Sequence, residues 1–193
     1  YIDIDDNGIS DTLSNYEWHR NALKESKIST LRINMGLAQN SLSEGIFNNY
    51  SIFTNNKNIN TKKSLVNWAK KNDMKLILSA RDMPSWLADT KTGLCNWTSS
   101  NSTCPPSNYT KWGELVVNYL QEVGCTPDVC IIEVWNEPNL AEFWLDNISN
   151  REDSVISKEY NKMYNSTYLA IKNIWPTMKV GGPTTTGMSQ VSR

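Results

Sequence analysis

The sequence has no excess of charge of either sign and no long apolar segment. Its 19 basic and 20 acidic residues give a formal net charge of −1 and are spread along the chain, without a basic run of the kind that binds nucleic acid or phospholipid. No apolar stretch approaches the about 20 residues that a helix needs to cross a bilayer. We therefore expect neither a nucleic-acid partner nor a membrane span in this segment.

The sequence also has little histidine, and it has no glycine-rich turn of the kind that binds a phosphate. The single histidine, His19, is far in sequence from all four cysteines, and neither close cysteine spacing is the C-x2-C of a zinc site. The segment MGLAQNSLSEG (35–45) follows a strand-like stretch but lacks the G-x-G-x-x-G spacing that binds a dinucleotide. The sequence therefore predicts no metal site and no cofactor.

Helix-like and strand-like patterns alternate along the chain, which is 39% hydrophobic and has enough apolar residues for a large core. Apolar residues at helical spacing predict helices over 16–26, 62–72, 111–123 and 157–175. Short apolar runs between them predict strands over 29–34, 74–80, 130–136 and 178–183, and 1–5 is typical of the end of a further strand. Strands and helices in this alternation form βαβ units and a parallel sheet.

The loops favour one α/β fold over another. Long polar loops follow the strands, at 36–60, 81–110 and 138–156, whereas the helix-to-strand loops are short. This asymmetry is typical of a (β/α)8 TIM barrel, which needs about 250 residues, and it disfavours the alternative, a doubly wound open sheet. We therefore interpret 1–193 as the N-terminal portion of a single barrel domain with about its first five strands. The remaining strands are expected beyond residue 193 of the same polypeptide or in a partner chain.

The four cysteines form two close pairs, Cys95 with Cys104 and Cys125 with Cys130. In a barrel the first pair would lie in a loop after a strand and the second in a loop before one, at opposite ends of the fold. Because disulfide-bonded residues have Cα atoms within about 7 Å of each other, only near-neighbour pairing is then easy. The alternative is four reduced thiols in a cytosolic enzyme.

Six N-x-S/T sequons indicate a secreted glycoprotein. They start at Asn49, Asn96, Asn101, Asn108, Asn147 and Asn165. Their number exceeds chance only slightly, but three of them cluster around the Cys95 to Cys104 loop. Disulfides and N-glycans both require a location outside the cytosol. The predicted location is therefore extracellular or at the cell surface.

The segment IIEVWNEPN (131–139) ends a buried strand with polar and acidic residues. Alternation along a strand predicts that Glu133, Trp135 and Glu137 share one side. Glu137 comes at the carboxyl end, where a barrel strand releases its side chain into the active face, and Pro138 ends the ladder. A carboxyl group held there is suited to general acid catalysis.

Glu133 cannot be the catalytic partner of Glu137. Four residues of strand separate their Cα atoms by roughly 13 Å, whereas two carboxyl groups that act together on one bond can lie only about 5 to 5.5 Å apart. Glu133 is instead expected to point into the barrel interior, where a buried carboxylate needs a cation. Arg32, within a predicted strand, is the candidate.

These motifs resemble a known group of enzymes. EVWNEPN (133–139) and a later strand that ends in VGGP (180–183) look like the clan A glycoside hydrolases, and most like family 39, which includes β-xylosidases and α-L-iduronidases. The order of elements is similar over most of the chain, with LRI (31–33) on an early strand and PSWL (84–87) after the next.

The resemblance implies a (β/α)8 barrel that hydrolyses O-glycosyl bonds of an oligo- or polysaccharide with retention. It implies that Glu137 is the acid/base, that Asn136 binds the substrate 2-hydroxyl, and that Arg32 orients the nucleophile. Trp86 would match a loop tryptophan that borders the sugar site. Trp144 and Asp82, which also follow predicted strand ends, complete the candidate substrate-binding residues.

One part of the machinery is missing from this segment. In the family the nucleophilic glutamate ends the seventh strand, and the sequence stops near the fifth, so the nucleophile is expected outside these residues. Asp82 follows the wrong strand for that role. The competing hypothesis is an extracellular structural or carbohydrate-binding protein that keeps the barrel without the reaction, and a third is a cytosolic metabolic barrel.

Overall fold

The computed structural model describes residues 17–37, 57–95, 103–147 and 152–186, with the backbone alone at 17–20 and 57–58. The predicted strand at 1–5 and three sequon asparagines, Asn49, Asn96 and Asn101, lie outside this part of the chain. The elements in chain order are α2 (Glu17–Glu25), β1 (Thr30–Asn34), α4 (Lys57–Lys71), β2 (Lys75–Ala80), α5 (Tyr109–Glu122), β3 (Cys130–Val134), α6 (Asp153–Ile174) and β4 (Lys179–Gly181).

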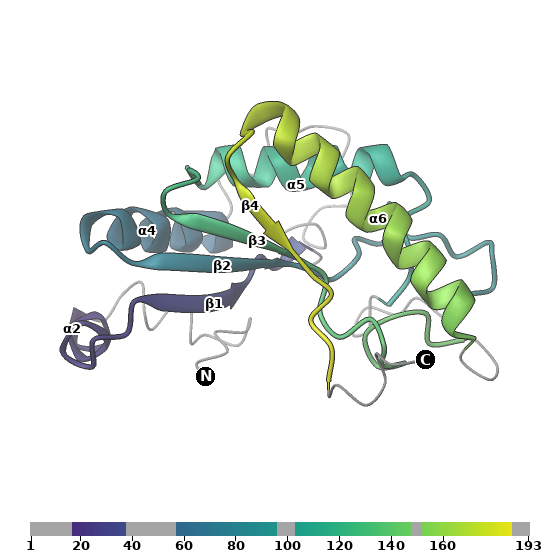
Figure 1. Ribbon diagram of the computed structural model, residues 1–193, viewed down its shortest axis with the longest axis horizontal. Coiled ribbons are helices and arrows are strands. Elements are labelled where there is room, and N and C mark those ends of the chain that lie inside the picture. Colours follow the sequence, from purple (N-terminus) through teal and green to yellow (C-terminus); the bar gives the residue numbers. More distant parts are fainter. Residues whose placement is uncertain (1–16, 38–56, 96–102, 148–151, 187–193) are drawn as a thin grey trace.

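The four described strands form one parallel sheet in the order β1-β2-β3-β4 (Figure 1). Leu76 of β2 pairs with Leu31 of β1 on one side and with Cys130 of β3 on the other, and Ile131 pairs with Lys179 of β4. Each strand therefore lies beside the next in sequence, joined to it by a helix. A doubly wound sheet reverses its strand order at a switch point, and no reversal occurs among these four strands.

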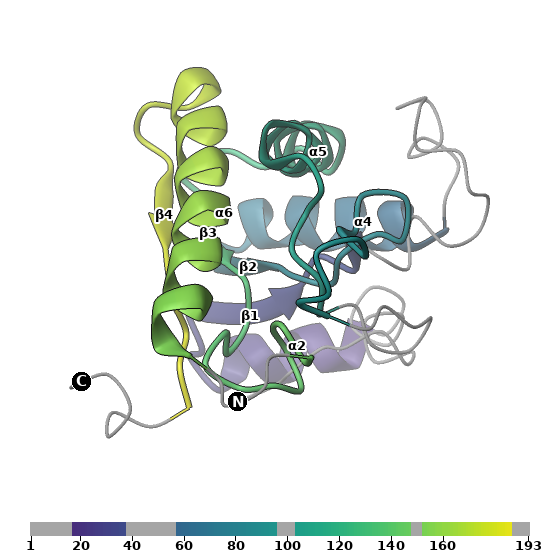
Figure 2. The ribbon, with the colours of Figure 1, turned by 90° about the vertical axis from the view of Figure 1, so that its right-hand side faces the viewer.

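Helices cover one face of the sheet (Figure 2). Alternate strand residues that point toward them are almost fully buried, and these include Ile33, Leu76, Leu78, Ile132 and Val134. Helices α5 and α6 pack closely because Gly113 has no side chain: a Cβ there would lie 2.9 Å from the Ser166 carbonyl oxygen and 3.0 Å from the Ala170 Cβ. The core thus fills the space between sheet and helices.

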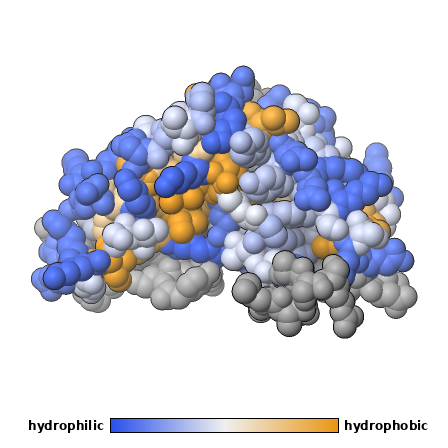
Figure 3. All heavy atoms as spheres, in the orientation of Figure 1, coloured by the Kyte–Doolittle hydropathy of each residue, from blue (hydrophilic) through white to orange (hydrophobic). Residues whose placement is uncertain are grey.

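The opposite face of the sheet carries the half-buried residues Arg32, Ile77, Ile131 and Glu133. Figure 3 shows an apolar patch over β2 and β3 on this face. In a closed barrel this face is the interior, which layers of side chains fill. The described strands therefore form one sector of such an interior.

The structure contains both near-neighbour disulfides. Cys95–Cys104, with Cα atoms 5.2 Å apart, closes part of the loop after β2, and Cys125–Cys130, at 5.8 Å, joins the turn after α5 to the start of β3. Within the described ranges no helix is both long and apolar enough for a membrane crossing. In the same ranges no group of three or more histidine, cysteine, aspartate or glutamate side chains is arranged to hold a metal ion.

Several predicted boundaries were wrong, and helix α6, for example, begins at Asp153 rather than 157. Helix α4 begins at Lys57 rather than 62, because Ile59 in its otherwise polar first turn is fully buried and anchors that turn. Strand β3 ends at Val134 rather than 136, because Trp135 adopts a left-handed backbone with φ of 66°. The early end of β3 determines the shape of the candidate site.

Candidate active site

Polar side chains gather at the carboxyl ends of the parallel strands. Asn34 ends β1, Asp82 follows β2, and Asn136 and Glu137 follow β3. In β/α barrels this end of the sheet carries the active site. Most of the predicted catalytic residues therefore come from neighbouring strands at the same edge.

Arg32 connects two of the predicted residues. Its Nε lies 3.0 Å from both carboxylate oxygens of Glu133, and its Nη2 also donates to that carboxylate. The same Nη2 donates to Asn136 Oδ1 at 2.7 Å. The side chains of Arg32 and Glu133 are only 13% and 12% exposed, so the predicted ion pair is largely shielded from water.

This arrangement fixes the amide of Asn136. A guanidinium has only donors, so the amide oxygen must face Arg32. The NH2 group is then the donor end of a side chain whose residue is only 7% exposed. Such an amide is suited to donate to a hydroxyl group of a bound molecule.

A second polar cluster joins the tips of β1 and β2. Asn34 Nδ2 donates to Asp82 Oδ2 at 2.8 Å, and Arg81 Nε lies 3.1 Å from the other carboxylate oxygen. Asn34 Oδ1 in turn accepts from the amide of Gly36 at 2.9 Å. Asp82 is thus held by partners on both strands.

The backbone around Glu137 is strained. Trp135 and Glu137 have φ values of 66° and 43°, and Asp82 has 69°. Left-handed backbone is uncommon in residues other than glycine and clusters at functional sites. The amide of Glu137 donates to the Thr184 carbonyl at 2.8 Å, and its carbonyl accepts from Leu140 at 2.9 Å. Hydrogen bonds from both sides therefore support this turn.

The predicted alternation across this turn was wrong. Trp135 does not share the side of Glu133: its ring packs edge-on against Trp112 of α5, with centroids 5.8 Å apart, and its Nε1 donates to the Phe143 carbonyl at 2.7 Å. Trp144 is fully buried against Trp135, with ring centroids 4.9 Å apart. Trp144 therefore belongs to the core and presents no face to a sugar.

Trp86 is half-buried in the loop after β2. That loop is pinned to the segment 103–107 by hydrogen bonds from Asp89 N to Pro105 O at 2.8 Å and from Ser107 N to Leu87 O at 2.7 Å. The Cys95–Cys104 disulfide closes the same loop. The loop that carries Trp86 is therefore well anchored, and the role of Trp86 at a sugar site stays a prediction.

Two residues near the site were given no role from the sequence. Tyr160 lies within the helix predicted over 157–175, and Thr184 lies past the last predicted strand. The hydroxyl of Tyr160 donates to the Val134 carbonyl at 3.0 Å, and the Thr184 carbonyl binds the amide of Glu137. Neither position carries a sequence signal, since the Tyr160 hydroxyl binds a backbone carbonyl and Thr184 contributes only its own carbonyl.

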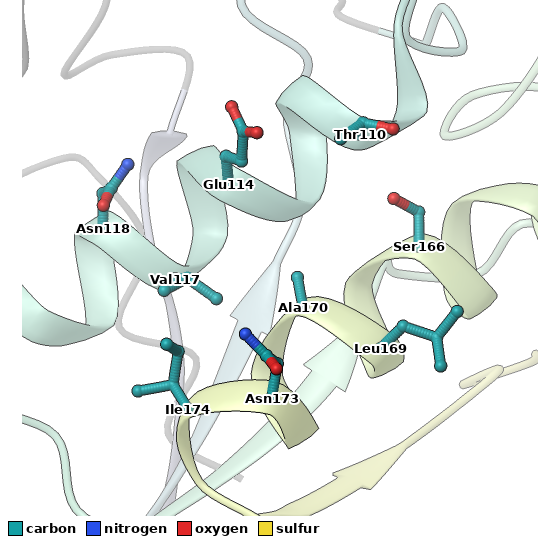
Figure 4. A pocket seen from close by; sticks show the side chains of 9 residues that line it. All are labelled: Thr110, Glu114, Val117, Asn118, Ser166, Leu169, Ala170, Asn173 and Ile174. Carbon is teal, nitrogen blue, oxygen red and sulfur yellow. The ribbon is translucent and has the colours of Figure 1, made fainter.

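A groove of about 600 Å³ lies between helices α5 and α6 (Figure 4). Its walls come from these two helices alone: Thr110, Glu114, Val117, Asn118, Ser166, Leu169, Ala170, Asn173 and Ile174. No strand-tip residue lines it. We therefore place the candidate active site at the strand tips and not in this groove.

The chain is similar to known proteins in both sequence and structure. The family described as "Glycosyl hydrolases family 39" matches residues 21–192. A beta-xylosidase from Geobacillus stearothermophilus is 35% identical over 112 residues, which are 55% of this chain and 20% of that protein. A beta-xylosidase from Caldicellulosiruptor saccharolyticus is 29% identical over 128 residues, or 63% of this chain and 24% of that protein.

Solved structures give the same fold. A GH39 enzyme from Xanthomonas axonopodis pv. citri has a TM-score of 0.60 at 21% identity, covering 96% of this chain and 34% of that one. A monomeric beta-xylosidase from Caulobacter crescentus CB15 has a TM-score of 0.62 at 20% identity, covering 96% and 35%. At these identities the likeness shows the fold alone, and it confirms the predicted partial (β/α) barrel. The chain spans about a fifth to a quarter of its curated relatives.

Proposed function

The chain belongs to glycosyl hydrolases family 39, and from this premise we propose that it carries the acid/base half of a retaining glycosidase. The observation that supports this most is the strained turn after β3, which holds Glu137 next to an amide, Asn136, already oriented by Arg32. The proposed nucleophile is a carboxylate of a strand outside these residues.

The reaction would proceed in two displacements. In the first, the nucleophile attacks the anomeric carbon while the Glu137 carboxyl protonates the departing glycosidic oxygen. In the second, the Glu137 carboxylate takes a proton from water, which attacks the glycosyl-enzyme and restores the nucleophile. The two carboxyl groups must lie about 5 to 5.5 Å apart for this mechanism.

Asn136 would bind the substrate, and Arg32 would hold Asn136 in the orientation that this requires. The NH2 group of Asn136 is proposed to donate to the sugar 2-hydroxyl, a contact of the kind that strengthens in the transition state. Arg32 orients that amide and neutralises Glu133. Trp86 is proposed as an apolar border of the sugar site and Asp82 as a polar one.

A β-xyloside is the proposed substrate class. Both curated relatives described above are beta-xylosidases. An α-L-iduronide, the other substrate named with this family, carries a carboxylate and would need a cation. Among the described residues, Arg32 and Arg81 are already paired with Glu133 and Asp82, so neither of these two guanidinium groups is available for a substrate carboxylate. Initial rates on the two aryl glycosides would decide between them.

We also propose a secreted glycoprotein whose further strands close the barrel. The two disulfides support an oxidising location. Asn108, Asn147 and Asn165 are all exposed, as acceptors of glycans must be. The intact mass before and after enzymatic removal of N-glycans, with and without thiol alkylation, tests this; an unchanged mass together with reactive thiols would contradict it.

Glu137→Gln in the complete protein tests the acid/base role. The amide cannot donate the proton, so kcat/KM should fall by about 100-fold or more on xylosides with a poor leaving group. On an activated aryl xyloside, whose leaving group needs little protonation, kcat/KM should change only slightly. Equal losses on both substrates would contradict the assignment.

A further inference from the structure

We propose that Tyr160 is a positioning residue for Glu137, which it holds in place through the carbonyl group of Val134. This inference rests on the proposed function and adds a residue to it. Tyr160 lies on α6, in the layer of helices behind the sheet, and touches no reacting group. Its effect must therefore pass through the backbone of the turn that carries Glu137.

The first step is the contact between Tyr160 and the end of β3. The pairing of β3 with β4 stops at Glu133 and Gly181, so Val134 lies one residue past it. The Val134 carbonyl accepts from the Tyr160 hydroxyl at 3.0 Å, and Tyr160 is only 6% exposed. Burial, and then the nearby Tyr164 and Glu133, raise the pKa of Tyr160 above its ordinary value. The hydroxyl thus stays protonated and serves as a constant donor.

The second step is the space that Gly182 leaves for this contact. Its φ is 136°, and a Cβ there would lie 2.4 Å from the Tyr160 hydroxyl oxygen and 3.0 Å from the Val134 carbonyl oxygen. Any larger residue would therefore displace the hydroxyl from its acceptor. Helix α6, strand β3 and the segment after β4 meet at this one point.

The third step joins this point to Glu137. The amide of Glu137 donates at 2.8 Å to the carbonyl of Thr184, two residues after Gly182. The turn 134–137 is thus held at its first residue by Tyr160 and at its last by Thr184, and between them by the Ala80 carbonyl, which accepts from Trp135 N at 3.0 Å. Because Trp135 and Glu137 both have strained, left-handed backbone, we expect loss of the Tyr160 contact to shift the turn toward a less strained conformation. A displacement of about 1 Å at a catalytic group can reduce the rate by about 100-fold.

Tyr160→Phe in the complete protein tests the proposal, with Tyr164→Phe as the matched control. Tyr164 is one turn further along α6, and its hydroxyl contacts the Val180 carbonyl at 3.4 Å. For Tyr160→Phe we expect kcat/KM to fall about 10- to 100-fold on a xyloside with a poor leaving group and less than about threefold on an activated one. Tyr164→Phe should leave both values within about twofold of the wild type.

Unequal losses distinguish positioning from stability, since a smaller folded fraction lowers both values equally. Gly182→Ala keeps the Tyr160 hydroxyl but displaces it, so it should show the same unequal loss on the two substrates. It takes the place of Tyr160→Phe if that variant fails to fold. Equal losses on both substrates, or no loss in an active enzyme, would overturn the role of Tyr160. If the wild type is inactive, or Glu137→Gln shows no dependence on the leaving group, the proposed function itself fails and this inference with it.

Discussion

Arg32 has two partners, and its two contacts can be separated experimentally. It neutralises the largely buried Glu133 and orients Asn136. Arg32→Ala would leave the Glu133 carboxylate uncompensated, at a cost of about 3–5 kcal/mol in the free energy of unfolding. The double variant Arg32→Met with Glu133→Gln removes both charges and should regain most of that stability, measured by chemical denaturation.

Activity should not follow stability in the double variant. Without the guanidinium, Asn136 has lost the group that fixes its amide, so we expect kcat to remain at least about 10-fold below the wild type. If the double variant is as unstable as Arg32→Ala, the charge on Glu133 is not what Arg32 compensates. If it is fully active, Arg32 does not position Asn136.

Residue identity predicted some parts of the site and not others. The Arg32–Glu133 pair followed from the need of a buried carboxylate for a cation, and the structure contains it. The expectation for Trp144 failed because its ring is buried against Trp135, and the expected side of Trp135 failed because the backbone turns left-handed there. Tyr160 escaped notice because a tyrosine on an apolar helix stripe is usually a core residue, and its hydroxyl contacts only backbone.

Helices α5 and α6 are joined by a polar contact as well as by close packing. The carboxylate of Glu159 on α6 accepts from Lys162 Nζ at 2.6 Å and from the Tyr109 hydroxyl of α5. Burial raises the pKa of Glu159, but the hydrogen bonds from Lys162 and Tyr109 together outweigh it and hold the pKa below its ordinary 4.5. The ionised carboxylate is therefore the form that stabilises the fold.

Glu159→Gln should consequently destabilise the protein in a pH-dependent way. The contribution of a carboxylate with a lowered pKa is complete above its unfolded value and is lost as pH falls through the folded value. We expect a cost of about 1 kcal/mol at pH 7 that disappears once the pH falls below the lowered pKa of Glu159. Denaturation midpoints at several pH values measure this, with the exposed Glu114→Gln of α5 as control. A cost independent of pH would contradict the role of the charge.

Element types were easier to predict than element ends. Every described strand was expected from a short apolar run, since such runs reflect burial against helices. The start of α4 was missed because one buried residue, Ile59, anchors a polar turn, and the end of β3 because one φ angle changes sign. The ends of helices and strands depend on single tertiary contacts, which the hydrophobic pattern of the sequence does not predict.

The open face of the sheet allows a test of the whole barrel. Ile77 of β2 is half-buried there, whereas Leu169 of α6 is 67% exposed on the helix layer. If further strands close the barrel, Ile77→Asp buries an unpaired charge and costs about 3 kcal/mol or more, while Leu169→Asp costs less than about 0.5 kcal/mol. Soluble yield and the denaturation midpoint of the complete protein report both effects. Equal tolerance of the two substitutions would mean that this face stays open to solvent.

The role of Glu137 in both displacements is tested most directly by rescue with azide. Glu137→Ala removes the group that activates water, so with an activated aryl β-xyloside the glycosyl-enzyme should accumulate. Azide needs no general base. We predict that it raises the turnover of Glu137→Ala by about 10-fold or more, leaves the wild type unchanged, and gives a glycosyl azide of retained configuration. Turnover of Glu137→Ala that azide does not raise, or a product of inverted configuration, would contradict the assignment of Glu137 as the acid/base of a retaining glycosidase.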